Sequence, residues 1–319
     1  MRSRFALGAV LALALALPGA LACAHDDRDI SFTMNVKGDQ DVITCSDVDM
    51  KFWSGRRMND DMVNVRRDQT VSVSAPRSGA LRVAASSQGA VWVQPSSNGS
   101  LSATICTVAA AESQSASNAL LDQLRIVNEN GELRVEGPEQ GYWGAYVILS
   151  VPNETSLDME AQNGALEARG VTGTFSLRTQ NGPIAMTNVS GKVTARAANG
   201  PISFKGHEGD IDLKAENGPV SVKINNPIWS GKGLDASTEN GPITVVAPDG
   251  LKTGVRIEGS DNSPLSWKGH STMVTSDWSS NRTIVLGKGP ILVRVSTVNG
   301  PVSIKSSSPA SSTGGKSRI

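Results

Sequence analysis

The dipeptide Asn-Gly returns at a fixed interval through the middle of this sequence. Within residues 119–305 its asparagines are Asn130, Asn163, Asn181, Asn199, Asn217, Asn240 and Asn299. The four from Asn163 to Asn217 are evenly spaced with an 18-residue step, while the steps before and after them are longer and imply insertions. A fixed period of this kind is typical of repeat architectures, so it constrains the fold more than any other feature of the chain.

Apolar and polar residues alternate on both sides of each Asn-Gly. Phe175 and Leu177 precede one of these dipeptides, and Ile184 and Met186 follow it. A period of two on both sides of a turn indicates two half-buried strands. The pattern therefore predicts that each repeat consists of a strand, an Asn-Gly turn, a second strand and a second turn such as 189–191. Asn and Gly are expected to supply the positive φ angles that such corners need.

Two all-β architectures fit this pattern. A hairpin meander would use Asn-Gly as its two-residue turn, but it would need a second layer to cover its apolar face. In a single-chain β-solenoid each 18-residue unit is one coil, and stacked asparagines can hydrogen-bond from coil to coil. The solenoid is favoured because a meander would accept other turn residues, and the crossover rule predicts a right-handed coil. The expected structural ladder comprises Asn163, Gly164, Asn181, Gly182, Asn199, Gly200, Asn217, Gly218, Asn240, Gly241, Asn299 and Gly300.

The repeat divides the rest of the chain into further segments. We expect the β-solenoid domain to occupy residues 119–305. Residues 25–118 contain short alternating runs such as "TVSVSAP" and "AVWVQ" and predict an N-terminal β-rich cap, in which 109–118 is a loop. Residues 306–319 are rich in Ser and predict a disordered tail.

Residues 1–24 have the pattern of a signal peptide. Arg2 and Arg4 precede an apolar run at 5–17, and small residues follow as far as Ala24. No later stretch approaches the length of a transmembrane helix, so we expect an exported protein of the periplasm or cell surface. The alternative is an outer-membrane lipoprotein anchored through Cys23.

Cleavage after Ala24 would leave two cysteines, Cys45 and Cys106. An even number of cysteines in an oxidising compartment favours a disulfide between them. The alternative is a pair of buried free thiols.

The units "NGPIAMTNVSGKVTARAANGPI", with the preceding "VILSVPNETSLDMEAQNGAL" and the closing "VRVSTVNGPVSIK", resemble the bacterial putative-adhesin family. The resemblance covers roughly residues 120–305. It implies an exported β-strand-repeat domain of unknown function, akin to the heads of autotransporter adhesins. The resemblance defines no catalytic residue.

Basic side chains recur in one column of the repeat. This column comprises Arg178, Arg196 and Lys214. A shorter column comprises Lys205 and Lys223. Stacked cations of this kind could bind an anionic polymer, whereas the alternative is a solvated face neutralised by Glu160, Asp212 and Glu216.

The motif "HEGDID" groups His207, Glu208, Asp210 and Asp212 at one corner. Carboxylates near a turn can bind calcium, but the other corners lack acids and the glycine-rich calcium repeat is absent. The motif therefore favours a polar corner, and we predict no metal or other cofactor.

Three tryptophans, Trp229, Trp267 and Trp278, lie near the C-terminal end of the repeat. Exposed indoles at Trp267 and Trp278 could stack on sugars. The alternative is that all three pack in the core or in a cap.

Motifs for catalysis are missing from the sequence. Neither G-x-S-x-G nor H-E-x-x-H occurs, and the 30 basic residues balance the 30 acidic ones, so no global field recruits nucleic acid. We therefore predict a non-enzymatic envelope protein for adhesion, scaffolding or polymer binding, whose partner is an envelope polymer, a glycan or a surface protein. The alternative is a polysaccharide-acting enzyme on a β-helix with paired carboxylates.

Overall fold

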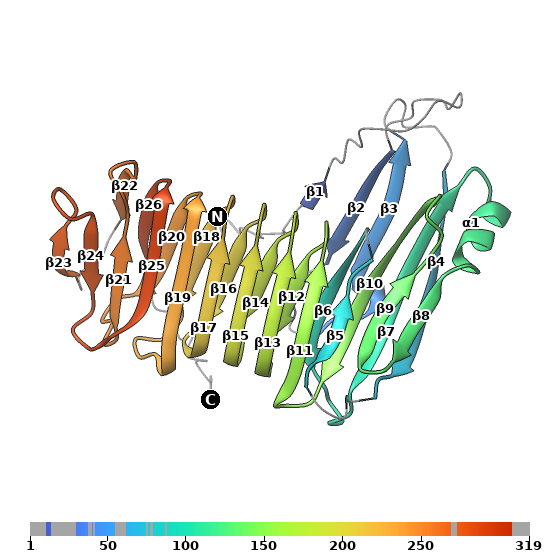
Figure 1. Ribbon diagram of the computed structural model, residues 1–319, viewed down its shortest axis with the longest axis horizontal. Coiled ribbons are helices and arrows are strands. Elements are labelled where there is room, and N and C mark those ends of the chain that lie inside the picture. Colours follow the sequence, from blue (N-terminus) through green and yellow to red (C-terminus); the bar gives the residue numbers. More distant parts are fainter. Residues whose placement is uncertain are drawn as a thin grey trace, which may run out of the picture. The chain divides into compact units, whose positions relative to one another are not determined.

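The computed structural model consists mainly of β-strands (Figure 1). It describes residues 11–13, 30–37, 40, 42–54, 62–74, 76, 79–86, 88–268 and 273–307 of the chain. The predicted all-β class is confirmed, and the sheets are open and mixed, with both parallel and antiparallel pairs. The predicted cleavage site, Cys23 and most of the predicted tail lie outside the described residues.

The chain divides into two compact units, residues 1–182 and 183–319. Within the first unit the strand orders are β1-β2-β3, β12-β6-β10-β7-β4 and β13-β11-β5-β9-β8. Its elements are β1 (Leu11–Leu13), β2 (Ile30–Val36), η1 (Cys45–Asp47), β3 (Val48–Ser54), β4 (Val63–Ser72), β5 (Leu81–Ala84), β6 (Gly89–Pro95), β7 (Ser102–Ala111), α1 (Gln114–Leu121), β8 (Arg125–Glu129), β9 (Glu132–Glu136), β10 (Tyr142–Val151), β11 (Thr155–Ala161), β12 (Leu166–Arg169) and β13 (Thr172–Thr179).

Within the second unit the strand orders are β22-β26-β20-β18-β16-β14 and β23-β24-β21-β25-β19-β17-β15. Its strands are β14 (Ile184–Thr187), β15 (Ser190–Ala197), β16 (Ile202–Gly206), β17 (Glu208–Ala215), β18 (Val220–Ile224), β19 (Ser230–Asn240), β20 (Ile243–Pro248), β21 (Gly254–Glu258), β22 (Leu265–Lys268), β23 (Met273–Asp277), β24 (Thr283–Leu286), β25 (Ile291–Asn299) and β26 (Val302–Ser307).

Successive repeats pair in parallel with the register that the sequence period demands. Ile184 lies opposite Ile202, which lies opposite Val220, and all three side chains are buried. The two strands of each repeat belong to different sheets, because β15, β17 and β19 form one series and β14, β16 and β18 the other. The repeats are therefore not hairpins, and the meander is excluded for this region.

The last repeat of the second unit does not follow chain order. Strands β25 and β26 lie between β19 and β20 on one side and β21 and β22 on the other. The long step from Asn240 to Asn299 thus spans an excursion whose strands lie beyond the final repeat. Asn299 donates its side-chain N–H to Asn240 at 2.9 Å and accepts one from Asn262 at 3.3 Å.

Hydrogen bonds also join the other repeat asparagines within each unit. Asn181 donates to Asn163 at 2.8 Å in the first unit. In the second unit Asn217 donates to Asn199 at 3.1 Å, and Asn240 donates to Asn217 at 3.0 Å. These side-chain bonds run from strand to strand in the direction of the repeat.

The glycines at the repeat corners are needed for close packing, and the expectation of positive φ there was wrong. At the Asn-Gly corners from 163 to 300, all within the described ranges, neither residue has a positive φ. A Cβ on Gly218 would instead lie 2.2 Å from the carbonyl oxygen of Gly200. Positive φ occurs at the other set of corners, for example 92° at Gly191 and 114° at Gly209.

The first Asn-Gly of the series is a different structure. Asn130 and Gly131 have φ angles of 54° and 74° and join β8 to β9 as an antiparallel hairpin, in which Glu129 lies opposite Glu132. This geometry is the usual two-residue turn for Asn-Gly. This Asn-Gly is therefore not one of the stacked corners, which begin at Asn163.

The segment 109–118 is not the loop that we expected. Strand β7 continues to Ala111, and α1 begins at Gln114 after Ser113, whose hydroxyl accepts the N–H of Ala116 at 3.2 Å. A serine at this position is a favoured helix N-cap. The helix crosses the domain boundary predicted at residue 118.

Candidate functional site

The predicted basic column is part of a mosaic of charges. Arg196 and Lys214 lie opposite each other in the β15–β17 pair and alternate with buried alanines, so they face outward. Each member of the column has an acidic partner: Arg178 with Asp158 at 2.6 Å, Arg196 with Asp212, and Lys214 with Glu239 at 3.0 Å. This column is therefore not a uniformly positive stripe.

Two carboxylates lie opposite each other on the same sheet of the second unit. Asp212 of β17 pairs in register with Asp235 of β19. Asp235 is exposed as a residue, but partial desolvation of its carboxyl raises the pKa of that group, the charge of Asp212 raises it further, and the charge of Arg294 opposes the shift. Unequal carboxyl groups of this kind can divide acid and base roles in glycoside chemistry. Asp212 is exposed and paired with Arg196, so this arrangement lies on an open strand face.

A shallow hollow of about 360 Å³ lies where three successive corners of the second unit stack. Its walls come from Ser190 and Gly191, from 208–210 and from 230–232. Lys232 forms an ion pair with Asp210 at 3.2 Å within it. Neither Asp212 nor Asp235 contributes to these walls, so the hollow and the opposed carboxylates are separate features.

The "HEGDID" motif does not bring a set of metal ligands together. His207 Nδ1 lies 2.7 Å from Asn225 Oδ1, and the Asn225 amide donates to Asn188 at 3.1 Å. In the described part of the chain, the one cluster of three close His, Cys, Asp or Glu ligand atoms lies elsewhere. The motif thus forms a polar corner in which His207 continues a short ladder of side-chain amides.

The three tryptophans have different surroundings. Trp229 is buried, packs against Phe204 with 5.9 Å between ring centroids, and donates its indole N–H to the Gly209 carbonyl at 3.2 Å. Trp267 is half-buried and lies in register with Ile304, so it belongs to the inward-facing column of the last strand. Trp278 is half-buried against Gly259. Trp229 is thus a packing residue, and the other two residues are each partly exposed.

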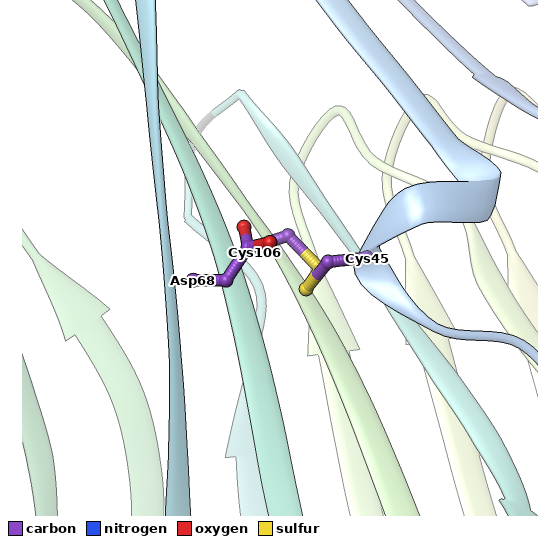
Figure 2. A group of neighbouring side chains, drawn as sticks. All are labelled: Cys45, Asp68 and Cys106. Carbon is purple, nitrogen blue, oxygen red and sulfur yellow. A yellow bond between two sulfur atoms is a disulfide. The ribbon is translucent and has the colours of Figure 1, made fainter.

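The predicted disulfide between Cys45 and Cys106 is confirmed and joins η1 to β7 (Figure 2). A carboxylate oxygen of Asp68 lies within 4.8 Å of both sulfur atoms. Each sulfur is bonded to the other, so neither is available as the thiolate that a metal would need.

The disulfide fixes the N-terminal strands over an apolar surface of the first unit. Side chains of η1 and β3, including Met50 and Phe52, pack in one buried cluster with Trp92 of β6 and Ile148 of β10. Burial raises the pKa of the Tyr146 hydroxyl in this cluster well above its usual value. This face of the sheet is therefore closed to solvent.

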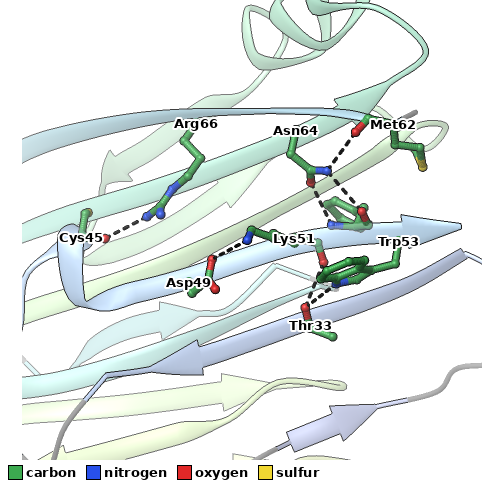
Figure 3. A network of polar contacts seen from close by, with 9 residues as sticks. Thr33, Cys45, Asp49, Lys51, Trp53, Met62, Asn64 and Arg66 are labelled. Atoms are coloured by element: carbon green, nitrogen blue, oxygen red, sulfur yellow. Dashed lines mark hydrogen bonds and ion pairs between the residues drawn. The ribbon is translucent and has the colours of Figure 1, made fainter. Parts of the chain in front are cut away.

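Polar contacts hold the same strands at their edge (Figure 3). The Asn64 side chain accepts the backbone N–H of Phe52 at 2.8 Å and donates to its carbonyl at 3.2 Å. Arg66 donates to the Cys45 carbonyl at 2.8 Å, and the Trp53 indole donates to Thr33 at 2.9 Å. The segment η1–β3 is thus attached to the sheet by the disulfide, by the apolar cluster and by hydrogen bonds to its backbone.

The shorter basic column differs from the longer one. Lys205 and Lys223 lie opposite each other in the β16–β18 pair, on the sheet that does not carry Arg196 and Lys214. Neither lysine forms an ion pair within the described residues. The sequence identified this column but did not show that further lysines extend it.

Within the described ranges, the structure contains no helix of the length and apolarity that a membrane span requires. No protein-family model matches the chain, and no curated protein matches it.

Solved structures similar to this chain include putative adhesins, the family that the repeat resembles. One such adhesin from Bacteroides fragilis NCTC 9343 is 11% identical with a TM-score of 0.39, and the match covers 78% of this chain and 99% of that one. A putative cell adhesion protein from Clostridium sporogenes ATCC 15579 is 13% identical with a TM-score of 0.30, covering 77% and 100%. A putative lipid binding protein from Parabacteroides distasonis ATCC 8503 is 11% identical with a TM-score of 0.37, covering 75% and 96%.

Proposed function

We propose that this chain is an exported, non-enzymatic β-solenoid of the bacterial cell envelope that binds a polymer or glycan in adhesion or scaffolding. The coils are about 18 residues long and right-handed, and residues 25–118 contribute the N-terminal cap, which α1 continues to Leu121. The observation that carries the proposal is the parallel pairing of equivalent residues, such as Ser203 with Ser221. This pairing repeats the same outward side chains at every strand spacing of about 4.8 Å, which suits a ligand that itself repeats.

Two features support an envelope location. The disulfide between Cys45 and Cys106 is of the kind that persists in oxidising compartments. Residues 1–24 have the order of a signal peptide, and attachment through Cys23 is the alternative to free export. Both versions place the repeat where it can meet envelope polymers or surface proteins.

Two sets of residues are proposed to contact the polymer on the basis of the sequence. One is the column Arg178, Arg196 and Lys214, and the other is the indole pair Trp267 and Trp278. The partial exposure of Trp267 and Trp278 is compatible with stacking on sugars. The ion pairs of the basic column weaken its attraction for an anion.

A polysaccharide-acting enzyme is the competing function. The opposed carboxylates of Asp212 and Asp235 favour the enzyme, because the raised pKa of Asp235 makes this carboxyl the better candidate for the general acid. The position of these carboxylates on an open strand face argues against the enzyme, because glycoside hydrolysis needs a site that holds the sugar ring between two carboxyl groups.

The test is binding and hydrolysis measured on the same set of envelope polymers and glycans. The chain that begins at His25 is expected to bind at least one polymer and to release no reducing ends. Trp267→Ala with Trp278→Ala probes the indole contacts, and Trp53→Ala, an exposed indole of the first unit, is the matched control. Release of reducing ends that is abolished by Asp235→Asn would establish the enzyme instead.

A further inference from the structure

Six strands of the second unit share a five-residue sequence pattern. The segments are "PIAMT", "PISFK", "PVSVK", "PITVV", "PVSIK" and "PLSWK", beginning at Pro183, Pro201, Pro219, Pro242, Pro301 and Pro264. The second and fourth residues, such as Ile202 and Phe204, are buried or half-buried. The first, third and fifth residues therefore face outward, because side chains alternate across a strand.

Parallel pairing arranges these outward residues in three columns. One column consists of proline rings, and the second consists of hydroxyls. The hydroxyl column is Ser203, Ser221, Thr244, Ser303 and Ser266, each in register with the next. The third column is Lys205, Lys223, Val246, Lys305 and Lys268, in the same strand order. Four ammonium groups thus share one face over five adjacent strands, or about 19 Å from first to last.

The strands that carry these lysines hold no acid of their own. Asp and Glu are absent from β14, β16, β18, β20, β26 and β22. Among the described residues Lys205, Lys223 and Lys268 form no ion pair. Lys205 lies directly opposite Lys223 at a strand spacing of about 4.8 Å. Like charges in this position repel each other, so the face carries an electrostatic cost that its own strands do not relieve.

In the opposite sheet of the same unit, cationic side chains have acidic partners on neighbouring strands. Its strands carry both signs, and Lys214 and Lys232 have the acidic partners Glu239 and Asp210. The difference between the two sheets is therefore one of charge composition and not of backbone geometry.

We propose that the outer face of β16, β18, β20, β26 and β22 binds a linear anionic polysaccharide. This rests on the proposed function and names the class of polymer. Lysines supply point charges for carboxylate, sulfate or phosphate groups. The adjacent hydroxyl column supplies hydrogen bonds for sugar hydroxyls, and the proline rings supply a flat apolar border.

The same face is poorly suited to single-stranded nucleic acid. Binding of that kind relies on aromatic side chains on which the bases stack. The aromatic residues of these strands, Phe204 and Trp267, occupy inward-facing positions. Charge and hydroxyls without aromatic rings favour a sugar polymer over a nucleobase polymer.

The experiment uses the chain that begins at His25 and measures dissociation constants for polygalacturonate, with dextran as a neutral polymer. The face variant combines Lys205→Gln, Lys223→Gln and Lys268→Gln. The control variant combines Lys232→Gln, Arg256→Gln and Arg294→Gln, which changes the net charge equally on the opposite sheet. We expect the face variant to bind about tenfold more weakly at low salt, since exposed pairs each contribute a fraction of a kcal/mol, and the control to bind like wild type.

The outcomes separate this inference from the proposed function. Binding of dextran alone, or equal weakening of both variants, would overturn the polyanion face while leaving polymer binding intact. Failure of the wild-type protein to bind any polymer would remove the proposed function as well. Tighter binding to single-stranded DNA or to phosphatidylglycerol vesicles than to polygalacturonate would overturn the assignment to a sugar polymer. Thermal unfolding of the face variant is expected to match wild type or exceed it, because the variant removes opposed like charges.

Discussion

The outer faces of the sheets differ in chemistry between the two units of this chain. In the first unit the outer face of β6, β7 and β10 is apolar and is covered by η1 and β3. In the second unit the outer face of β16, β18 and β26 consists of Pro, Ser and Lys and is open. The inward-facing residues are mostly aliphatic in both units, with Phe175 and Phe204 among them. The inward pattern therefore builds the stack, whereas the outward residues decide whether a face needs a protein cover or can receive a ligand.

The largest expected effect follows from removing the disulfide that fixes the cover of the first unit. Cys45→Ser with Cys106→Ser opens a link with a sequence separation of 61 residues. We expect a loss of about 4 kcal/mol in the chain-entropy model, because the unfolded chain regains the freedom that the link removed. Urea unfolding measures the loss, and binding of a hydrophobic dye reports exposure of the Trp92 and Ile148 face.

Reduction of the wild-type protein is the control for this prediction. Dithiothreitol should reproduce the behaviour of the double serine variant and should leave that variant unchanged. An unaltered urea midpoint in the variant would show that the apolar cluster and the contacts of Asn64 and Arg66 hold the cover without the covalent bond.

The second prediction concerns the close contact of backbones in the second unit. In Gly218→Ala the new Cβ would meet the Gly200 carbonyl oxygen at 2.2 Å, so the two strands would have to separate. We expect a loss of about 3 kcal/mol, at the upper end of the usual cost of overpacking.

Gly250→Ala is the matched control for this glycine. Gly250 has a φ of 77°, but a Cβ added to it would have no neighbouring atom within 4 Å, so only the left-handed backbone is penalised. That penalty is about 1 kcal/mol. Calorimetric melting compares the two variants, and equal losses would mean that the corner is governed by φ and not by the contact between strands.

Much of the stack could be predicted from the sequence because it follows from local rules. The 18-residue period sets the register, and the alternation around Ile184 and Ile202 sets the inward face. The disulfide followed from the count of cysteines. The sequence could not predict that β25 lies between β19 and β21 and that β26 lies between β20 and β22. Strands of equivalent repeats have similar patterns, so the sequence alone does not show which of them pair.

The candidate surface was harder to predict than the fold for a physical reason. Arg196 and Lys214 are as regular in sequence as Lys205 and Lys223, but their acidic partners lie on neighbouring strands. Whether a basic column is neutralised depends on these neighbours across the sheet. The extension of the lysine column to Lys268 also depends on the out-of-order strand β22. Asn-Gly forms a hairpin turn at 130–131 and a stacked corner elsewhere, and which of the two it forms likewise depends on how the flanking strands pair.

The third prediction tests how tightly the covered face of the first unit is packed. Trp92 is 1% exposed, and its indole N–H has no hydrogen-bond partner in the described structure, although the Arg169 guanidinium lies 4.8 Å from the ring centroid. In Trp92→Phe the lost contacts are offset by removal of an unpaired buried donor, so we expect a change within about 1 kcal/mol of zero. In Trp92→Ala the larger cavity should cost about 4 kcal/mol. Chemical denaturation measures both, and a large loss in the phenylalanine variant would indicate that the N–H has a partner.

The smallest expected effect concerns Asp235 on the charged sheet of the second unit. Because folding raises the pKa of this carboxyl, its contribution favours the folded state fully below the unfolded pKa and is lost as the pH rises through the folded pKa. Asp235→Asn should therefore raise the melting temperature slightly near neutral pH, and this gain should shrink as the pH falls into the range where the acid is protonated. Asp158→Asn is the contrasting variant, because Asp158 forms an ion pair with Arg178, and its removal should not stabilise the protein at any pH. A pH-independent difference between Asp235→Asn and wild type would mean that the Asp212 charge and burial do not act on this group, and the opposed pair would then give no support to acid and base roles on that sheet.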